Sequence, residues 1–464
     1  MMKARLIALM QAVKEPRRVV ALLVFVLSFA LRIRGVGSHF ILLGDQIRDW
    51  SIALKPFTQL PLIGPPTHVG GYTVGPAFYW ILWSIRMGVG PFFHNLPHAG
   101  GIGQAAIQSA ADAILLVAIW RRTKSPWIAL ATVVLVATAS FDLSLAALVW
   151  NPTMGTALAK IAIATVLLDW HRGSHARALA AAAIAWSAVQ AYTGAVFVAV
   201  GVLMAMLADP LIQRDWRLTR RNVLAITAAV VLLQLPYVAH QITHRFQDQA
   251  MGAVTHGVTR ILSGERPPEV AKSIDGYVDA VRYIQIAPWS IPRAGWVLLI
   301  CCGIVAVRHY KDPALLSVTL LPQLAAIAGY ALFLEALDSY YYLSLMPAAV
   351  LTCVLAVTAI PSPGVARVAA IVLLAGALAL VPGRIRHERV MGRMPEYGLL
   401  VDASRKIQSL GQPMRAIETE FKLPPTANPE FLFEVLGGRI DRHARWICLI
   451  RADGTVSYRQ VDGS

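Results

Sequence analysis

Residues 19–31 have the sequence VVALLVFVLSFAL, a run of thirteen residues with no charged side chain. Arg17 and Arg18 precede this run, and Arg32 and Arg34 follow it. An apolar run with basic flanks is typical of a membrane-spanning helix, which needs about twenty mainly apolar residues to cross the hydrocarbon core. Because no small-x-small cleavage site follows, we expect an uncleaved first span rather than a signal peptide.

The composition of the whole chain indicates that lipid is its main solvent. Of its 464 residues, 56% are hydrophobic and 15% are charged, and the mean hydropathy is +0.57. A soluble globule needs more polar surface than this, and the apolar residues form long blocks rather than short amphipathic repeats. The sequence therefore predicts a polytopic α-helical membrane protein.

Neither the charge nor the cysteines indicate another class of protein. The net charge is +16, but the basic residues lie mainly between apolar blocks, where they orient a membrane protein, and they are not interleaved with aromatic residues. We therefore expect no nucleic-acid partner. The four cysteines show no spacing typical of a disulfide framework or a zinc site.

The apolar blocks predict about eleven transmembrane helices, as a multi-pass protein of the inner (plasma) membrane. Basic residues cluster at the N-terminus and behind every second block, which places the N-terminus in the cytoplasm by the positive-inside rule. The block at residues 178–207 is too long for one span and has a polar break at 190–194, so we expect two helices there. The other expected spans are residues 19–31, 102–119, 127–148, 154–168, 223–239, 295–307, 315–334, 340–360 and 365–381.

The expected organisation is a transmembrane core at residues 1–383 and a small α/β domain at residues 384–464, on the outer face. The core has a large first outer loop, residues 35–100, and a second long outer loop, residues 240–293. The C-terminal segment has helical patterns at 399–410 and 429–436 and strand patterns at 414–421, 446–450 and 456–460. The last two flank Asp453-Gly454, a favoured hairpin turn.

The first outer loop opens with an acidic motif, Asp45-Gln46-Ile47-Arg48-Asp49. On a short helix this spacing places Asp45 and Asp49 on one face, where they can share a proton, a metal ion or a cationic partner. A pair of merely solvated acidic residues is the alternative. No cofactor is required by this pattern, and a divalent metal is compatible with it.

Farther along the same loop, glycine and proline are dense, in LIGPPT at residues 62–67 and GGYTVGPAFYW at residues 70–80. This density predicts a fixed irregular backbone rather than a flexible tether. Tyr79 and Trp80 are alternatively ordinary anchors at the membrane interface.

These motifs resemble those of the GT-C membrane glycosyltransferases, in particular the branch of protein mannosyltransferases and lipid A aminoarabinose transferases. Asp45-Gln46-x-Arg48-Asp49 and the Gly-Pro segments are similar to a bacterial subgroup in which the usual Asp-Glu pair becomes Asp-Gln. Trp150-Asn151-Pro152 and Tyr340-Tyr341-Tyr342, ahead of Pro347, also resemble that subgroup. The resemblance covers residues 18–382.

The resemblance implies an inverting transfer of a sugar from a polyprenyl-phosphate-linked donor, on the outer face, to an envelope glycan, lipid or protein. Asp45 matches the catalytic acidic position of the family. Gln46 lies where the family usually has glutamate, and Asp49 is the candidate to replace that glutamate. Arg48, Lys55, Arg245 and Arg260 are candidates, with Arg266, to bind the leaving phosphate. The expected substrate-binding residues are Gln46, Arg48, Lys55, Tyr72, Tyr79, Trp150, Asn151, Tyr192, Arg245, Arg260 and Tyr341.

A transporter or flippase of lipid-linked or small polar substrates is the alternative function, and a scaffold protein is a third. A transporter needs ionisable residues deep inside its spans. The main examples here are Asp142 and Lys160, both expected near span ends. No internal repeat is visible, which argues against a transporter built from two repeated halves.

Overall fold

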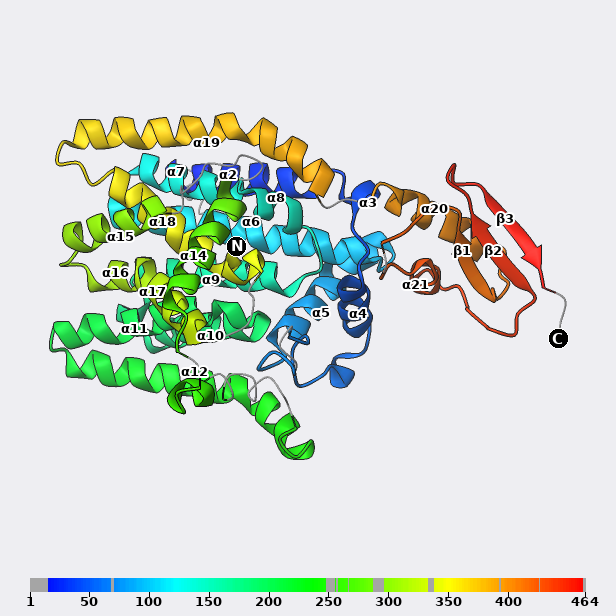
Figure 1. Ribbon diagram of the computed structural model, residues 1–464, viewed down its shortest axis with the longest axis horizontal. Helices are drawn as coiled ribbons and strands as arrows, with labels where there is room; N and C mark the ends of the chain where they lie inside the picture. The colour runs from blue at the N-terminus through cyan, green and yellow to red at the C-terminus, as the bar shows by residue number, and fades with distance from the viewer. Residues whose placement is uncertain are drawn as a thin grey trace, which may run out of the picture.

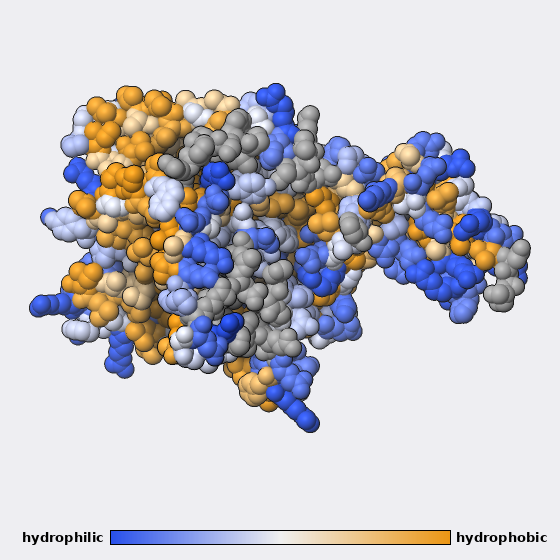
Figure 2. Space-filling model, viewed as in Figure 1, coloured by the Kyte–Doolittle hydropathy of each residue, from blue (hydrophilic) through white to orange (hydrophobic). Residues whose placement is uncertain are grey.

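The computed structural model describes residues 16–67, 71–247, 255, 258–265, 267–286, 296–332, 338–391, 394–424 and 426–461. Its helices form a bundle, and a small α/β domain projects from one end of that bundle (Figure 1). Apolar side chains gather over the bundle, whereas hydrophilic side chains dominate the projecting domain (Figure 2). The expected division between residues 383 and 384 stays a prediction.

Among the described residues, six helices are long and apolar enough to cross a membrane, or seven if one bent pair counts as a single span. The bent pair is α16 (Pro313–Thr319) and α17 (Leu321–Leu332), which meet at 41°. Two shorter apolar helices are α7 (Pro126–Ala137) and α15 (Trp296–Arg308). The polytopic helical architecture is therefore confirmed, and the count of eleven stays a prediction.

Most helices of the bundle coincide with the apolar blocks. The polar break at residues 190–194 separates α10 (His175–Ala191) from α11 (Val196–Ile212), as expected, with a short 3-10 turn η4 (Thr193–Ala195) between them. The remaining helices of this group are α2 (Pro16–Ile33), α6 (Pro97–Thr123), α9 (Asn151–Leu167), α12 (Trp216–Thr243), α18 (Met346–Val357) and α19 (Pro363–Met391).

The expected single span at residues 127–148 is instead two elements, α7 and α8 (Ser140–Leu145). The chain breaks at Thr138, whose carbonyl and hydroxyl oxygens both accept hydrogen bonds at 2.9 Å from the buried Arg384 guanidinium. Arg384 also donates to the carbonyl of Gln285 at 2.6 Å. A long-range contact that occupies a helix carbonyl is invisible to a hydropathy pattern, which explains the error.

Both expected outer loops contain helices. The first holds α3 (Val36–His39), α4 (Gly44–Ala53), η1 (Phe57–Gln59), α5 (Ala77–Val89) and η2 (Gly90–Phe93). The second holds α14 (Val270–Ile286), whose Tyr277 and Ile284 are fully buried. A 3-10 segment, η5 (Ser339–Leu345), precedes α18. The buried residues of α14 and η5 belong to the apolar cluster inside the helix bundle, whereas those of α4 and α5 belong to a second cluster.

The C-terminal domain has the elements that the sequence predicts. They are α20 (Glu396–Gln408), β1 (Ala416–Thr419), α21 (Pro429–Val435), β2 (Trp446–Ile450) and β3 (Val456–Gln460). The sheet order is β1-β2-β3, with β1 parallel to β2 and β2 antiparallel to β3. Ile450 pairs with Val456 beside the Asp453-Gly454 turn.

The C-terminal domain shares an apolar core with the layer formed by α3, α4 and α5. One continuous buried cluster includes Phe40, Trp50 and Tyr79 from the layer and Tyr397 and Phe433 from the domain. A separate cluster lies inside the helix bundle. Because burial of a shared apolar surface is the main stabilising term in folding, the domain and this layer form one packed unit.

Four charged side chains lie buried among α2, α6, α8 and α9. Arg32 Nη2 lies 2.6 Å from both Asp112 and Asp142, and Lys160 Nζ lies 2.8 Å from Asp112 and 2.9 Å from Asp142. Lys160 is the tenth of the seventeen residues of α9, so its expected place near a span end is wrong. The cluster is neutral in total, as buried charges require to offset their desolvation.

Candidate active site

α4 joins the three charged residues of the acidic motif in a chain of ion pairs. Arg48 Nη1 lies 2.8 Å from Asp45 Oδ1, and Arg48 Nε lies 2.8 Å from Asp49 Oδ1. The Asp45 side chain is 55% exposed, whereas that of Asp49 is fully buried. One arginine thus connects a carboxylate that faces the surface with one that is sealed inside.

The environment of Asp49 sets its protonation. The Tyr79 hydroxyl donates a hydrogen bond of 3.0 Å to Asp49 Oδ1, and Asp49 Oδ2 is buried without a hydrogen-bond partner in the described part of the chain. Burial raises the pKa of Asp49 to about 6, although the Arg48 guanidinium and the Tyr79 hydroxyl oppose the increase. Asp49 therefore titrates close to neutral pH.

Gln46 fixes α4 to the layer beneath it. Its Oε1 accepts a hydrogen bond from the backbone N–H of Leu43 at 3.0 Å, and its Nε2 donates to the carbonyl of Val149 at 3.3 Å. The Gln46 side chain is buried. Both of its polar atoms are thus engaged with backbone, which makes it a link between the acidic helix and the Trp150-Asn151 segment.

The Gly-Pro segments form the fixed backbone that the sequence predicts. The N–H of Gly64 donates to the carbonyl of Thr73 at 3.0 Å, and the N–H of Thr73 returns a hydrogen bond to Pro65 at 2.9 Å. A Cβ atom on Gly64 would lie 2.8 Å from the carbonyl oxygen of Gly75, so only glycine fits this approach. Tyr72, which pairs with Pro66 in an antiparallel bridge, is exposed.

Aromatic residues from three distant segments meet beside α9. The rings of Trp150 and Tyr340 lie 5.4 Å apart, and those of Tyr340 and Tyr341 stack at 4.6 Å. The Tyr192 hydroxyl donates to the carbonyl of Tyr340 at 3.2 Å. Asn151 is the first residue of α9, next to this group. The structure therefore brings together four of the expected substrate-binding residues, Trp150, Asn151, Tyr192 and Tyr341.

Gln104 holds this aromatic group in place and was missed by the sequence analysis. Its Nε2 donates to the carbonyl of Trp150 at 2.7 Å, and its Oε1 accepts from the N–H of the same residue at 3.3 Å. Gln104 lies in an apolar block, in α6, and is fully buried. The sequence did contain a signal for this role, because a glutamine inside a predicted span needs buried hydrogen-bond partners.

The expected phosphate-binding cations are more scattered. Lys55 is exposed just after α4, and Arg245 is exposed just after α12. Arg260 forms an ion pair of 3.4 Å with Glu265. Within the described residues, no hydrogen bond or ion pair joins any of the three to the α4 carboxylates. Arg266 lies outside the described residues.

The space between the two carboxylates of α4 is filled by the Arg48 side chain. The guanidinium of Arg48 occupies the space between Asp45 and Asp49, and no group of three or more His, Cys, Asp or Glu side chains that can hold a metal occurs in the described ranges. A divalent ion requires several hard oxygen ligands. The divalent metal stays an untested expectation.

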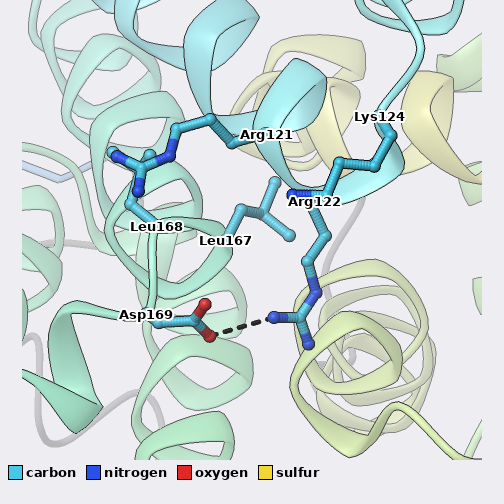
Figure 3. Close-up of a pocket in the computed structure, with 6 residues that line it drawn as sticks. All are labelled: Arg121, Arg122, Lys124, Leu167, Leu168 and Asp169. Carbon is cyan, nitrogen blue, oxygen red and sulfur yellow. Dashed lines mark hydrogen bonds and ion pairs between the residues drawn. The ribbon is translucent and has the colours of Figure 1, made fainter.

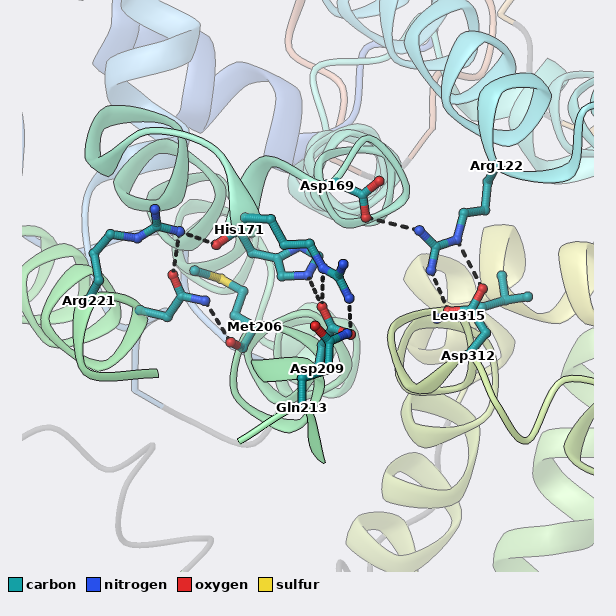
Figure 4. Close-up of polar contacts among 11 residues, drawn as sticks. Arg122, Asp169, His171, Met206, Asp209, Gln213, Arg221, Asp312 and Leu315 are labelled. Carbon is teal, nitrogen blue, oxygen red and sulfur yellow. Dashed lines mark hydrogen bonds and ion pairs between the residues drawn. The ribbon is translucent and has the colours of Figure 1, made fainter. Parts of the chain in front are cut away.

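A pocket of about 340 Å³ lies at the other end of α9 (Figure 3). Its lining residues are Arg121, Arg122, Lys124, Leu167, Leu168 and Asp169. Arg122 connects Asp169, at 2.9 Å, with Asp312, and nearby Arg172 and His171 both contact Asp209 (Figure 4). Cations here neutralise the carbonyl ends of α6 and α9. At 1.5 Å per residue, about 25 Å of helix separates this pocket from Asn151.

Comparisons with known proteins place the fold. No family profile matches the sequence, and no curated protein matches it. The crystal structure of ArnT from Cupriavidus metallidurans bound to undecaprenyl phosphate is similar, with a TM-score of 0.51 and 13% identity over 90% of this chain and 83% of that chain.

Two further structures score lower. The apo state of the same ArnT has a TM-score of 0.48 and 12% identity, over 91% of this chain and 84% of that one. The Archaeoglobus fulgidus oligosaccharyltransferase in complex with Zn and sulfate has a TM-score of 0.46 and 14% identity, over 91% and 62%. At these identities the likeness is one of fold. The chain therefore shares its fold with the ArnT structure that has a TM-score of 0.51.

Proposed function

We propose that this protein is a membrane glycosyltransferase that moves a sugar from a polyprenyl-phosphate-linked donor to an envelope glycan, lipid or protein on the outer face of the inner membrane. The N-terminus is cytoplasmic in this proposal, and the C-terminal domain is extracytoplasmic. The fold likeness to ArnT supports it, because that protein binds undecaprenyl phosphate. The observation that carries it is the exposed Asp45 carboxylate, held by Arg48 at the end of the bundle from which the C-terminal domain projects.

Asp45 is the proposed general base. The acceptor hydroxyl attacks the anomeric carbon, the bond from that carbon to the phosphate oxygen breaks, and the hydroxyl proton passes to Asp45. The polyprenyl phosphate leaves with its negative charge, and the configuration at the anomeric carbon inverts. Asp45 lies in the first turn of α4, and its exposed carboxylate is accessible to an acceptor hydroxyl.

Arg48 has two roles in this scheme. It fixes the direction of the Asp45 carboxylate from one side, while Asp49, which accepts a hydrogen bond from the Tyr79 hydroxyl, holds its guanidinium from the other. As the donor phosphate departs, a fixed cation next to the reacting atoms stabilises the growing charge. Lys55, exposed at the end of the same helix, is the second candidate for this contact.

The proposed donor lies partly in the bilayer. Its sugar and phosphate lie beside α4, Asn151 and the aromatic group of Trp150, Tyr192, Tyr340 and Tyr341, and its lipid tail lies along the apolar helices. Aromatic faces are common sugar-binding surfaces because their apolar area is rigid and large. Tyr72 borders the same region from the Gly-Pro turn.

The transporter alternative has one observation in its favour, the buried cluster of Arg32, Asp112, Asp142 and Lys160. Intramembrane charges often mark an ion pathway. Here, however, each cation contacts both carboxylates, and three of the four side chains are fully buried. A sealed, neutral cluster is a structural element rather than a path, so it favours the glycosyltransferase.

A direct assay separates the two functions. The purified protein in lipid nanodiscs is incubated with polyprenyl-phosphate sugars and with envelope material from a deletion strain, and mass spectrometry detects a covalently added sugar. The same protein in liposomes is tested for movement of a labelled lipid-linked sugar between leaflets. Movement without any covalent transfer would favour the flippase and end the glycosyltransferase proposal.

A further inference from the structure

The C-terminal domain contacts the acidic helix at its first residue. The N-cap residue of α4 is Leu43, whose side chain has no oxygen to accept the free N–H groups of the first turn. The Thr426 hydroxyl, 382 residues away in the chain, accepts the hydrogen bond from the N–H of Gly44 at 2.9 Å. A side-chain oxygen that accepts from a free N–H group at this end of a helix stabilises its first turn.

The fit around this contact is tight. A Cβ atom on Gly44 would lie 3.1 Å from the Cβ of Thr426, closer than side chains usually approach. Gly44 immediately precedes Asp45. The residue before the candidate base is thus the point at which the two parts of the molecule touch.

A second contact fixes the domain at the other side of the layer formed by α3, α4 and α5. The Tyr397 hydroxyl and His98 Nδ1 are hydrogen-bonded at 2.9 Å, and the rings of Tyr397 and Phe40 lie 5.2 Å apart. Tyr397 is fully buried. Gly398 lies against Ser38, with 3.5 Å between an ideal Cβ and the Ser38 Cβ. α20 therefore packs on the segment that leads into α4.

We infer that the C-terminal domain is a fixed part of the active site, and that Thr426 is a positioning residue that holds the first turn of α4 and with it the Asp45 carboxylate. This inference rests on the proposed function for its kinetic consequence only. Thr426 does not touch the substrate in this scheme. It acts by limiting the fraying of the turn that carries Asp45.

Two variants of Thr426 test the role of the hydroxyl in the full-length protein. Thr426→Val keeps the side-chain shape and removes the hydrogen bond, and Thr426→Ser restores it. We expect Thr426→Val to lower kcat about two- to fivefold, the range for one exposed helix-capping bond, with donor KM unchanged. Thr426→Ser should recover at least half of the loss. Thr455→Val is the matched control, because Thr455 is an exposed threonine of the same domain that bonds only within its own turn.

Hydrogen exchange provides a readout that does not depend on catalysis. The Gly44 N–H should exchange about two- to fivefold faster in Thr426→Val than in the parent protein or in Thr455→Val. Faster exchange in a protein that transfers no sugar would support the positioning role and reject the proposed function. Unchanged exchange and unchanged kcat in an active protein would reject the positioning role and leave the function intact.

A cross-link tests whether the domain is fixed. Cβ atoms 3.5 Å apart suit a disulfide, so Ser38→Cys combined with Gly398→Cys should form one on mild oxidation. We expect the oxidised protein to keep its transfer rate within twofold of the reduced protein. Loss of transfer on oxidation, with recovery on reduction, would show that the domain must move and would overturn the inference.

Discussion

The Tyr79 hydroxyl donates a hydrogen bond to Asp49, thirty residues earlier in the chain, at 3.0 Å. This contact joins α5 to α4 and stabilises the ionised form of a buried carboxylate. Burial and the Asp49 carboxylate also raise the pKa of Tyr79 above its usual range, so Tyr79 remains a donor at every working pH. Asp49 and Tyr79 therefore support Arg48 from a fixed position, and of the two only Asp49 titrates in the working pH range.

Transfer should decline as the pH falls through about 6, because Asp49 then takes up a proton and Arg48 loses one of its two carboxylate partners. Removing the Tyr79 hydroxyl removes an interaction that lowers the pKa of Asp49, so Tyr79→Phe should shift this acid limb to higher pH. A pH profile of kcat for both proteins measures the shift. If the acid limb of Tyr79→Phe lies at the same pH as that of the parent protein, the titration of a group other than Asp49 causes it.

The two carboxylates should differ in importance. Asp45→Asn retains the size of the side chain but removes the base, and we expect kcat to fall about 100-fold or more. Asp49→Asn should cost less, because Arg48 keeps its ion pair with Asp45. Melting temperature and gel filtration of both variants control for unfolding. Full activity in folded Asp45→Asn would exclude Asp45 as the base.

Donor affinity should depend on the cations nearest to Asp45. We expect Arg48→Gln or Lys55→Gln to weaken donor binding by about 1.5 to 3 kcal/mol, the value of a hydrogen bond to a charged group, with little effect on acceptor binding. Arg260→Gln should have less effect, because Arg260 already pairs with Glu265. Arg245→Gln completes the set. Unchanged donor affinity in all four would place the phosphate elsewhere, for instance on backbone N–H groups of the Gly-Pro turn.

The buried ion cluster should be sensitive to removal of one partner but tolerant of removal of a pair. Lys160→Met leaves two carboxylates with Arg32 alone, and we expect it to destabilise the protein by about 3 to 5 kcal/mol. Lys160→Met combined with Asp142→Asn restores neutrality and should recover much of that loss. Thermal unfolding in detergent measures both. Equal stability of the single and double variants would contradict the electrostatic explanation.

The proposed orientation predicts which surface sites face the outside. Cysteines introduced at the exposed residues Thr58 and Lys406 should react with an impermeant thiol reagent in intact cells, after subtraction of labelling in the parent protein. A cysteine at the exposed Lys124, at the other end of α6, should react only after permeabilisation. The reverse pattern would invert the topology.

Local sequence patterns predicted the elements that depend on neighbours in the chain. β2 and β3 have the predicted bounds, because strand alternation and the Asp-Gly turn are local signals. The break between α10 and α11 followed from its polar residues. The acidic motif likewise placed Asp45, Arg48 and Asp49 together on one helical turn.

Contacts between distant segments were not predictable in the same way. Arg32 looked like a flanking charge, but it pairs with Asp142, 110 residues later, inside the bundle. The Thr138 break depends on Arg384, 246 residues later. Gln104 and Thr426 support the site through partners that no short window contains. The type of a residue indicates the chemistry it can perform. Its partners in these contacts depend on which helices pack together, and a short stretch of sequence does not indicate that.

The core shared by the layer of α3, α4 and α5 and the C-terminal domain imposes an order on synthesis. The ribosome completes residues 36–100 early, yet Tyr397, which covers Phe40, emerges about 300 residues later, after a delay of roughly 15 to 60 s at ordinary elongation rates. During that interval the apolar face around Phe40 is exposed at the membrane surface. A nascent chain that stalls before α20 is therefore a substrate for chaperones or proteases, and a premature stop codon that removes α20 leaves the apolar face around Phe40 without its cover.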